Sequence, residues 1–445
     1  MDGKPKPQVI VVGAGFGGLT AARKIAHLPV QLTVIDRKNH HLFQPLLYQV
    51  ATAGLSPGEI AAPIRWILRA HSNVEVLLEE VVDFKPEERK VVTKGQVLDY
   101  DYLVVASGAT HAYFGHDDWR EDAPGLKAIE DAIEIRRRVF LAFELAERQM
   151  VRGNPDMPLQ FVVIGGGPTG VELAGTLAEI SRHALTNQFR NIKPEQTRIM
   201  LFEGGPRVLP AYSENLSQKA EQQLRHLGVE VYTSSMVTKV EAGAVWIGDK
   251  KIITPVILWA AGVAASPCGR RLGAPVDRAG RVLVQKDLSV PGHPEVFVLG
   301  DLASLTDEHG KMLPGLAPVA MQQGRFVAQT IARDLERQPR RNFHYVDKGS
   351  LATIGRAAAV AQIGKLELSG YIAWLAWLFI HVFFLIGFRN RLVVMINWAW
   401  AYLTYERGAR LITGSNQLPG WRTVESDLQA NPEQEHREAV NSRSA

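Results

Sequence analysis

Six glycines in this chain are spaced as in two phosphate-binding turns. They are Gly13, Gly15, Gly18, Gly165, Gly167 and Gly170. They form two G-x-G-x-x-G segments, each after a short apolar run and before a segment with helical periodicity. In such a turn the first glycine permits the bend, the second lets a pyrophosphate approach the backbone, and the third lets helix and strand pack closely. Because the helix N-terminus faces the phosphates, the sequence predicts two dinucleotide sites.

An acidic residue follows each glycine segment at the matching place. Asp36 ends the strand-like run 32–35, and Glu203 ends the run 198–202. A carboxylate there accepts hydrogen bonds from ribose hydroxyls. Since it also repels a 2′-phosphate, Glu203 favours NADH over NADPH, a preference that the neighbouring Arg207 would weaken.

Two dinucleotides in one chain imply that the ligands react with each other, because nicotinamide and flavin are the pair that exchanges a hydride. The alternative is a duplicated fold with one inactive site. Both glycine sets and both acids are intact, which argues against that alternative.

The elements around these motifs predict an α/β fold. Segments 8–12, 19–26 and 32–35 read as strand, helix and strand, and segments 161–164, 170–180 and 198–202 repeat that order. We also expect a strand over 102–106, a helix over 130–152 and a strand over 296–299 that pairs with the first sheet. The prediction is two Rossmann-type dinucleotide-binding domains, the first interrupted by the second.

Composition excludes several classes of protein. The net charge of +4 over 445 residues is small and the basic residues are scattered, so nucleic acid is not an expected partner. The single cysteine, Cys268, excludes an internal disulfide and a redox dithiol. The start MDGKPKPQVI has no apolar leader, so we expect no signal peptide. No cluster of residues suggests a metal site.

The chain becomes strongly apolar after residue 365. Segment 372–388 is short for a membrane span. Segment 392–405, which follows a charged break, is too short to cross the membrane in the opposite direction. We therefore expect two helices lying in or dipping into one leaflet, with Trp398, Trp400, Tyr402 and Tyr405 at headgroup depth. Arg407 and Arg410 would meet anionic lipid. The alternative is a buried helical hairpin at the interface of a homodimer, and His381 is expected to be packed or interfacial.

These motifs resemble the two-dinucleotide-binding-domain flavoproteins and, within them, the type II NADH dehydrogenases (NADH:quinone oxidoreductases). The group is marked by the paired glycine segments, YDYLVVASGA and VFVLGD. The family is marked by HHLFQPLLYQVATAGLSPGEIAAPIR, GGGPTGVELAGTLAE and the apolar C-terminal pair. The resemblance covers roughly residues 8–415.

The resemblance implies which residues hold each dinucleotide. FAD would be bound by Gly13, Ala14, Gly15, Phe16, Gly17, Gly18, Asp36, Arg37, Val81, Ser107, Gly108, Gly300, Asp301, Ala317 and Pro318. NADH would be bound by Gly165, Gly167, Thr169, Gly170, Glu172, Glu203, Ala261 and Gly262. Asp301 would bind the ribitol of the flavin, and Val81 would touch the adenine through its backbone. Ser107 stands where the family usually has threonine.

Two residues are expected at the reaction centre. The resemblance places Glu172 in the channel between nicotinamide and flavin, with a role in positioning or proton handling. An acid that simply favours a helix N-terminus is the alternative. The family's Ala-Gln-x-x-x-Gln stretch is Ala317 to Gln322 here, with Pro318 replacing the first glutamine. Gln322 is the expected polar neighbour of a quinone, although a glutamine packed beside the flavin is the alternative.

We therefore expect a non-proton-pumping NADH:quinone oxidoreductase, monotopic or peripheral, on the cytoplasmic face of the inner membrane. The alternatives are an NADH-dependent reductase of a soluble electron carrier and a membrane-tethered NADH sensor. The expected domains are 1–118 and 276–365 for FAD, 119–275 for NADH, 366–420 for membrane anchoring, and a disordered polar tail over 421–445.

Overall fold

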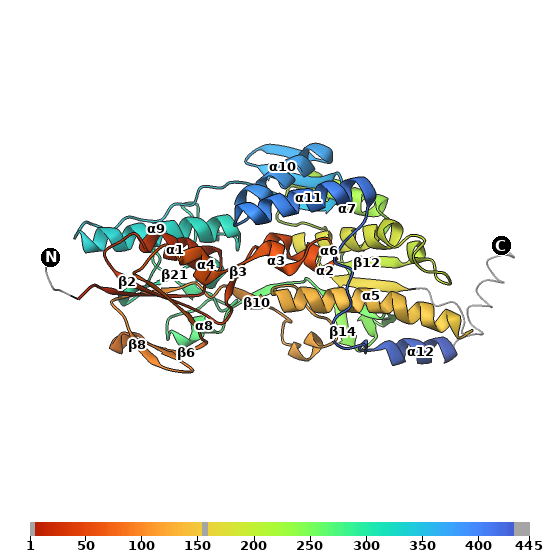
Figure 1. Cartoon of the computed structure of the whole chain (residues 1–445), viewed down its shortest axis with the longest axis horizontal. Helices are drawn as coiled ribbons and strands as arrows, with labels where there is room; N and C mark the ends of the chain where they lie inside the picture. Colours follow the sequence, from red (N-terminus) through yellow and green to blue (C-terminus); the bar gives the residue numbers. More distant parts are fainter. Residues whose placement is uncertain (1–4, 154–158, 431–445) are drawn as a thin grey trace. The chain divides into compact units, whose positions relative to one another are not determined.

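The computed structural model of the chain describes residues 5–153 and 159–430, which pack into two compact units (Figure 1). The first unit contains the described residues up to Leu42, together with Ala61–His111 and Val263–Lys348. The second unit contains Phe43–Ile60, Ala112–Gly262 and the described residues from Gly349 onward. These units are defined by packing and not by bound ligands. The FAD and NADH domains expected from the sequence therefore stay a prediction.

A six-stranded sheet with the order β20-β21-β9-β1-β2-β5 forms the centre of the first unit. Its strands are β20 (Ser289–Val290), β21 (His293–Val298), β9 (Tyr102–Val105), β1 (Gln8–Val12), β2 (Gln31–Asp36) and β5 (Val74–Leu78). All neighbouring pairs are parallel except β20 and β21. The pairing of β21 with β9 confirms that the late strand joins the first sheet. Parallel pairing brings the ends of β1, β2 and β9 to one edge.

Helices and a small sheet cover the central sheet of the first unit. Helices α1 (Phe16–Ile25) and α9 (Ala317–Leu335) pack closely, because a Cβ on Gly324 would lie 2.4 Å from the carbonyl oxygen of Gly17. The small sheet is β6 (Val81–Lys85), β7 (Lys90–Thr93) and β8 (Val97–Asp99). Its Phe84 and Val91 join a core with Ile10 and Leu103 of the central sheet.

Short elements complete the first unit. They are β3 (His40–Leu42), β4 (Ala61–Pro63), α4 (Ile64–Leu68), β10 (Ala109–His111), β18 (Val263–Ala265), α8 (Cys268–Arg271), β19 (Val282–Leu283) and β22 (Ala303–Ser304).

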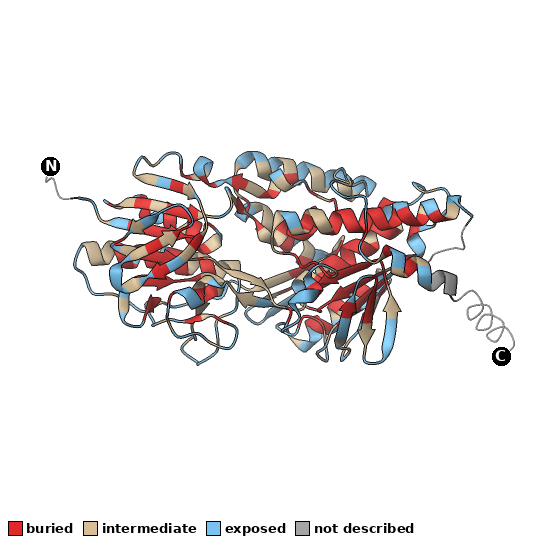
Figure 2. Ribbon diagram, turned by 90° about the horizontal axis from the view of Figure 1, so that it is seen from below, coloured by how far each residue is buried: buried red, intermediate tan, exposed pale blue. Residues whose placement is uncertain are grey.

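The second unit repeats the parallel arrangement with the strand order β13-β12-β11-β17. The strands are β13 (Val229–Tyr232), β12 (Arg198–Phe202), β11 (Gln160–Ile164) and β17 (Val256–Trp259). Helices α5 (Ile129–Val151), α6 (Pro168–Glu179) and α7 (Glu214–His226) pack against it, and the antiparallel strands β14 (Val237–Glu241), β15 (Ala244–Ile247) and β16 (Lys250–Ile253) share its core. Figure 2 shows the buried residues concentrated in these parallel strands and the helices against them.

Both helices that follow a glycine turn begin earlier than predicted. Helix α1 begins at Phe16 and not at Leu19, and α6 begins at Pro168 and not at Gly170. The last glycine of each motif therefore lies inside the helix, where it permits close packing. Pro168 occupies the first turn of α6, a position at which a missing backbone N–H has no consequence.

A second antiparallel sheet covers α6. It consists of β23 (Ser350–Gly355), β24 (Ala358–Ile363) and β25 (Leu366–Ser369). Gly175 is required at this contact, because a Cβ there would lie 1.7 Å from the carbonyl oxygen of Ile354. Short helices α2 (Leu47–Ala51) and α3 (Pro57–Ile60) belong to the same unit.

The apolar C-terminal segment forms two helices, α10 (Tyr371–Phe384) and α11 (Phe388–Thr404). Their inner residues pack on the unit: Trp377 is 2% exposed and its ring lies 5.3 Å from that of Trp398. Their outer residues are exposed, among them Phe379 at 68% and Leu403 at 77%. Across the described residues, no helix is both long enough and apolar enough to span a bilayer.

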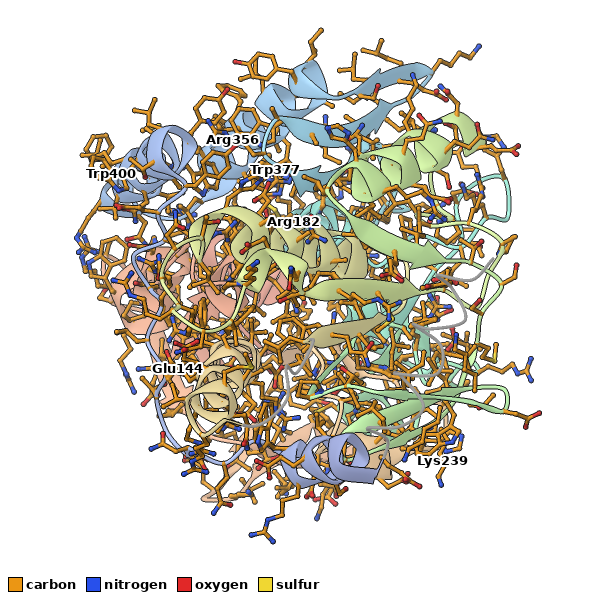
Figure 3. All side chains as sticks on the ribbon, turned by 90° about the vertical axis from the view of Figure 1, so that its right-hand side faces the viewer. Glu144, Arg182, Lys239, Arg356, Trp377 and Trp400 are labelled. Atoms are coloured by element: carbon orange, nitrogen blue, oxygen red, sulfur yellow. The ribbon has the colours of Figure 1, made fainter. Side chains whose placement is uncertain are left out.

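Two aromatic residues expected at headgroup depth face the unit instead. The Trp398 indole donates to Gln49 Oε1 at 2.7 Å, and Tyr402 stacks on Trp374 at 5.5 Å. Trp400 is 57% exposed and lies at the outer edge of α11 in Figure 3. The reason is geometric: at about 100° per residue, residues two apart on a helix face nearly opposite directions.

Two arginines expected to meet lipid also point inward. Arg407 donates to Glu179 Oε2 at 2.9 Å and to the carbonyl oxygen of Thr52 at 3.1 Å. The Arg407 and Glu179 side chains are only 13% and 12% exposed. Arg410 donates to the carbonyl oxygen of Ala184 at 3.1 Å. Both residues therefore hold the chain that leaves α11 against the second unit.

The start of the expected disordered tail is helical. Helix α12 (Trp421–Ala430) buries Trp421 and Val424, and Trp421 Nε1 donates to Glu425 at 2.8 Å. Two apolar side chains three residues apart share one face of the helix, which gives it a surface to bury. The rest of the tail, 431–445, lies outside the described residues.

We expect Arg407→Ala to lower the free energy of unfolding by about 3–5 kcal/mol, because it leaves the Glu179 carboxylate buried without its charged partner. Eight of the nine tryptophans belong to the second unit, Trp66 being the exception, so tryptophan fluorescence in denaturant reports on that unit. The exposed Arg422 is the matched control, and Arg422→Ala should leave stability within about 0.5 kcal/mol. Equal midpoints for the two variants would contradict the assigned role of the pair.

Candidate functional site

The two glycine turns have the same geometry, position by position. Gly13 and Gly165 have φ values of +94° and +106°, and a Cβ on either would lie 2.5 Å from backbone atoms of Ala106 or Ala260. Glycine is therefore required at both positions. A Cβ on Gly18 or Gly170 would lie 1.8 Å from the carbonyl oxygen of the first glycine, so these helices approach their turns as closely as the motif predicts.

The middle glycine of each turn is open. Apart from the glycine itself and its two chain neighbours, no atom lies within 4 Å of where a Cβ would stand on Gly15 or Gly167. Each helix N-terminus, at Phe16 and at Pro168, begins directly after this glycine. Exposed backbone N–H groups and the positive end of the helix dipole favour a phosphate group at both places.

Each motif acid supports its own turn. Asp36 Oδ2 accepts from the N–H of Ala14 at 2.6 Å, and its Oδ1 accepts from Lys38 at 2.7 Å. Glu203 Oε2 accepts from the N–H of Gly166 at 2.6 Å, and its Oε1 accepts from Gly205 at 2.6 Å. A carboxylate has about four lone-pair positions, so each acid keeps acceptor capacity for ribose hydroxyls.

Further residues at the same sheet edge of the first unit fit a flavin dinucleotide. The Ser107 hydroxyl is buried and has no hydrogen-bond partner within the described chain, so it is free to bond a ligand at this edge. Gly108 has φ +66° and open space where a Cβ would stand. Gly300 has φ +72°, and its N–H donates to Gln323 Oε1 at 2.7 Å, which shapes the turn that carries Asp301.

The other residues expected at FAD lie in the first unit as well. The ring of Phe16 meets His41 edge-on at 5.2 Å, Arg37 is exposed, and Val81 is buried with its carbonyl oxygen accepting from Arg271 at 3.1 Å. Ala317 and Pro318 form the first turn of α9. Proline is suited to that place because its N–H would be unpaired there.

Glu172 lies on α6 of the second unit and is partly buried. Burial raises the pKa of its carboxyl group well above the usual value, and a hydrogen bond from the backbone of Thr353 offsets part of that rise. Tyr48 and Tyr212 are buried close by, and the pKa of each is raised, first by burial and then by the charge of Glu172. Glu172 therefore keeps its proton to a higher pH than an ordinary glutamate does.

The other residues expected at NADH lie along the carboxyl edge of the second sheet. Thr169 is in the first turn of α6, and Ala261 and Gly262 follow β17. This edge is where an open α/β sheet binds its ligand. The seven residues expected at NADH other than Glu172 therefore lie at one edge of this sheet.

The two glutamines of α9 differ in their contacts. Gln322 Nε2 donates to the carbonyl oxygen of Val346 at 2.9 Å, and its Oε1 accepts from the N–H of Val346 at 3.0 Å. Gln323 is 1% exposed and bonds Gly300. The quinone role of Gln322 stays a prediction.

Sequence reasoning missed four residues that shape these sites: His41, Tyr48, Tyr212 and Gln323. His41 Nδ1 lies 2.9 Å from the carbonyl oxygen of Ala14, and burial lowers the pKa of His41. His41 and Tyr48 belong to the segment HHLFQPLLYQV, which marks the family. The polar residues within this segment are the sequence signal that could have identified both of them. Tyr212 and Gln323 carry no local signal, because their roles come from tertiary contacts.

His381 is stacked on Trp377 at 4.2 Å, and its Nδ1 lies 2.7 Å from the carbonyl oxygen of Trp377. Burial lowers the pKa of His381 to about 4, so the ring is neutral at neutral pH. The packing expected for His381 is confirmed. Among the described residues no three metal-ligating side chains come together, and Cys268 is a free thiol.

Comparison with known proteins identifies the family. Residues 7–324 match the family described as pyridine nucleotide-disulphide oxidoreductase, and residues 348–405 match the NDH2 C-terminal domain. Two proteins of Mycobacterium tuberculosis named type II NADH:quinone oxidoreductase are similar over 91% of this chain. NdhA is 43% identical with 89% of its length covered, and Ndh is 44% identical with 90% covered.

The fold is also that of a solved structure. The structure of NDH2 from Plasmodium falciparum in complex with NADH superposes with a TM-score of 0.80 at 20% identity, covering 91% of this chain and 99% of that one. Since a family model covers most of the chain and relatives above 40% identity cover nearly all of it, this chain belongs to the type II NADH:quinone oxidoreductase family of flavin-dependent oxidoreductases.

Proposed function

We propose that this chain is a non-proton-pumping NADH:quinone oxidoreductase that moves a hydride from NADH to FAD and then two electrons and two protons to a membrane quinone. The observation that carries the proposal is the duplicated turn. Both copies have an open middle glycine and a motif acid with spare acceptor capacity, so neither copy has the features of an inactive site.

The first unit is proposed to hold FAD. Gly15 and the N-terminus of α1 would face the pyrophosphate, and Asp36 would accept from the adenosine ribose. The unpaired Ser107 hydroxyl and Asp301 would bond the rest of the cofactor. When bound, FAD supplies the hydride acceptor and electron donor that side chains lack, and the protein supplies position and polarity.

The second unit is proposed to hold NADH. Gly167 and the N-terminus of α6 would face the pyrophosphate, and Glu203 would accept from the ribose hydroxyls of the adenosine. A 2′-phosphate there would meet a carboxylate already fixed by two backbone N–H groups. Glu203 cannot turn away without losing both bonds, which favours NADH over NADPH.

Glu172 is proposed to hold a proton for the reaction. Its raised pKa keeps the carboxyl group protonated to higher pH than an ordinary glutamate, and α6 connects it to the turn proposed for NADH. Gln322 is proposed as the polar neighbour of the quinone, where Pro318 leaves only one of the family's two glutamines. The backbone of Val346 already engages Gln322, so the amide is held in one orientation.

The outer face of α10 and α11 is proposed to bind the membrane surface, on the cytoplasmic side of the inner membrane. Its exposed apolar residues recur at helical spacing: Ile372, Leu375, Phe379, Phe383, Phe388, Leu392, Ile396, Trp400 and Leu403. A stripe of this kind can enter one leaflet while the opposite side of each helix packs on the protein.

The function is tested by recording the visible spectrum of the purified protein under anaerobic conditions. Adding NADH should bleach the oxidised flavin bands, and adding a short-chain quinone should restore them. A chain that lacks bound flavin, or whose bleached bands return with a soluble iron–sulfur protein and not with a quinone, would contradict the proposal.

We expect Glu172→Gln to lower kcat for quinone reduction about 100-fold, the low end of the effect of a general acid. In the wild type, kcat should fall as pH rises through the raised pKa of Glu172, because the carboxyl group then loses its proton. The Gln variant should lack that decline. Glu144→Gln, at an exposed glutamate of α5 labelled in Figure 3, is the control and should keep the wild-type profile.

The same shift affects stability with a defined sign. Because the pKa of Glu172 is higher in the folded protein than in the unfolded chain, its contribution to stability is present at low pH and is lost as pH rises through the folded value. Glu172→Gln should therefore reduce the loss of stability as pH rises from the unfolded to the folded pKa of this group. A Gln variant that loses stability with pH as steeply as the wild type would contradict this assignment.

We expect the double substitution Phe379→Glu and Leu403→Glu to weaken binding to vesicles of mixed neutral and anionic phospholipid by about tenfold or more, because each carboxylate would enter the apolar layer. Turnover with NADH and a water-soluble quinone should stay at the wild-type rate. Val97, also exposed but on β8 of the first unit, provides the control Val97→Glu. Vesicle sedimentation measures the difference, and unchanged binding by the double variant would refute the membrane role of this face.

A further inference from the structure

A tight turn in the second unit carries an aromatic ring in an unfavourable backbone conformation. Phe114 and Gly115 have φ values of +54° and +96°, and the turn closes with the N–H of His116 donating to the carbonyl oxygen of Tyr113 at 3.0 Å. Turns with two positive φ angles normally use glycine, asparagine or aspartate. A bulky residue there persists only where the surroundings hold it, and such strain concentrates at functional sites.

The residues around this turn are anchored, but the Phe114 ring is not buried. Tyr113 is 2% exposed, its hydroxyl donates to the carbonyl oxygen of Ala123 at 2.9 Å, and its ring stacks on Trp259 at 5.0 Å. Trp259 Nε1 in turn donates to the carbonyl oxygen of Ala112 at 2.9 Å. Phe114 itself is 70% exposed. The fold therefore holds the turn firmly and presents the ring to the outside.

The ring lies against the segment that follows β17. A Cβ on Gly262 would be 2.8 Å from Cζ of Phe114, and the N–H of Ala112 donates to the carbonyl oxygen of Gly262 at 3.2 Å. Glycine at 262 is what lets the ring approach the backbone. Phe114 thus lies at the carboxyl edge of the sheet, beside a residue proposed to contact NADH.

The strand order decides which half of the dinucleotide lies near Phe114. The ribose acid Glu203 follows β12, and the phosphate turn follows β11, so the ligand crosses from β12 over β11 towards β17. In this fold the adenosine lies on the side of the acid and the second nucleotide lies on the opposite side. Gly262 and Phe114 are on the β17 side.

We propose that Phe114 is a positioning residue for the nicotinamide half of NADH, with its ring packed on the nicotinamide ring. The inference rests on the proposed function, because it assumes that NADH binds at this edge. An apolar ring at the open side of the ligand excludes water and adds aromatic contact area. It contacts only the half of the ligand that carries the hydride.

The test uses substitutions that relieve the strain of the turn and remove the ring. Phe114→Asn and Phe114→Gly tolerate positive φ, so both variants should fold with a midpoint at or above that of the wild type. We expect each to raise the KM for NADH about tenfold, the size of the loss of one aromatic contact. Phe114→Tyr keeps the aromatic ring, so this variant should have the wild-type KM for NADH.

Binding of ADP-ribose, which lacks nicotinamide, separates this role from a general disturbance of the site. Its inhibition constant should be the same in the wild type, Phe114→Asn and Phe114→Tyr. Unchanged KM for NADH in the Asn and Gly variants would overturn the inference, and so would an equal weakening of NADH and ADP-ribose. A wild-type protein that does not oxidise NADH would instead overturn the proposed function itself.

Discussion

The hydrogen bond that a strand-end carboxylate accepts from the glycine turn beside it is the interaction on which both nucleotide sites depend. In each unit the acid of the second strand reaches the turn that follows the first, and bonds its N–H at 2.6 Å. The bond is charge-assisted and therefore strong for its length. It fixes the turn so that the remaining N–H groups keep one direction, and it requires the two strands to be adjacent and in register.

This constraint explains why the two motifs could be read from the sequence. Glycine spacing, the apolar strand before it and the acid after the next strand are all local signals, and parallel pairing converts them directly into geometry. The predicted strands 8–12 and 198–202 agree with β1 and β12 at both ends. The helices differ at their starts because the glycine motif extends into the helix, which periodicity of apolar residues does not detect.

Contacts between distant residues could not be predicted in the same way. Arg407 and Glu179 are separated by 228 positions. In the sequence, a basic residue that follows an apolar helix is as well suited to bind anionic lipid as to bind a distant carboxylate. The orientation of α11 is a similar case: Trp398 and Trp400 are both suited to a membrane interface, and only the packing partners Gln49 and Trp377 decide which one faces inward. Similarly, Glu172 is bonded by the backbone of Thr353 on β23 and interacts electrostatically with Tyr48 and Tyr212, and all three residues lie far away in the sequence.

Helix α6 shows how the second unit combines these local and distant contacts. Its first turn is the proposed pyrophosphate site, its middle carries Glu172 and packs through Gly175 on β23, and its last residue, Glu179, is bound by Arg407 and by the backbone of Arg356. Arg356 is in turn held between the rings of Tyr402 and Tyr405, at 4.1 Å from each centroid. A helix fixed at both ends cannot rotate, and a rotation by one residue would turn Glu172 by about 100°. The C-terminal helices therefore set the direction of the carboxyl group on which proton handling would depend.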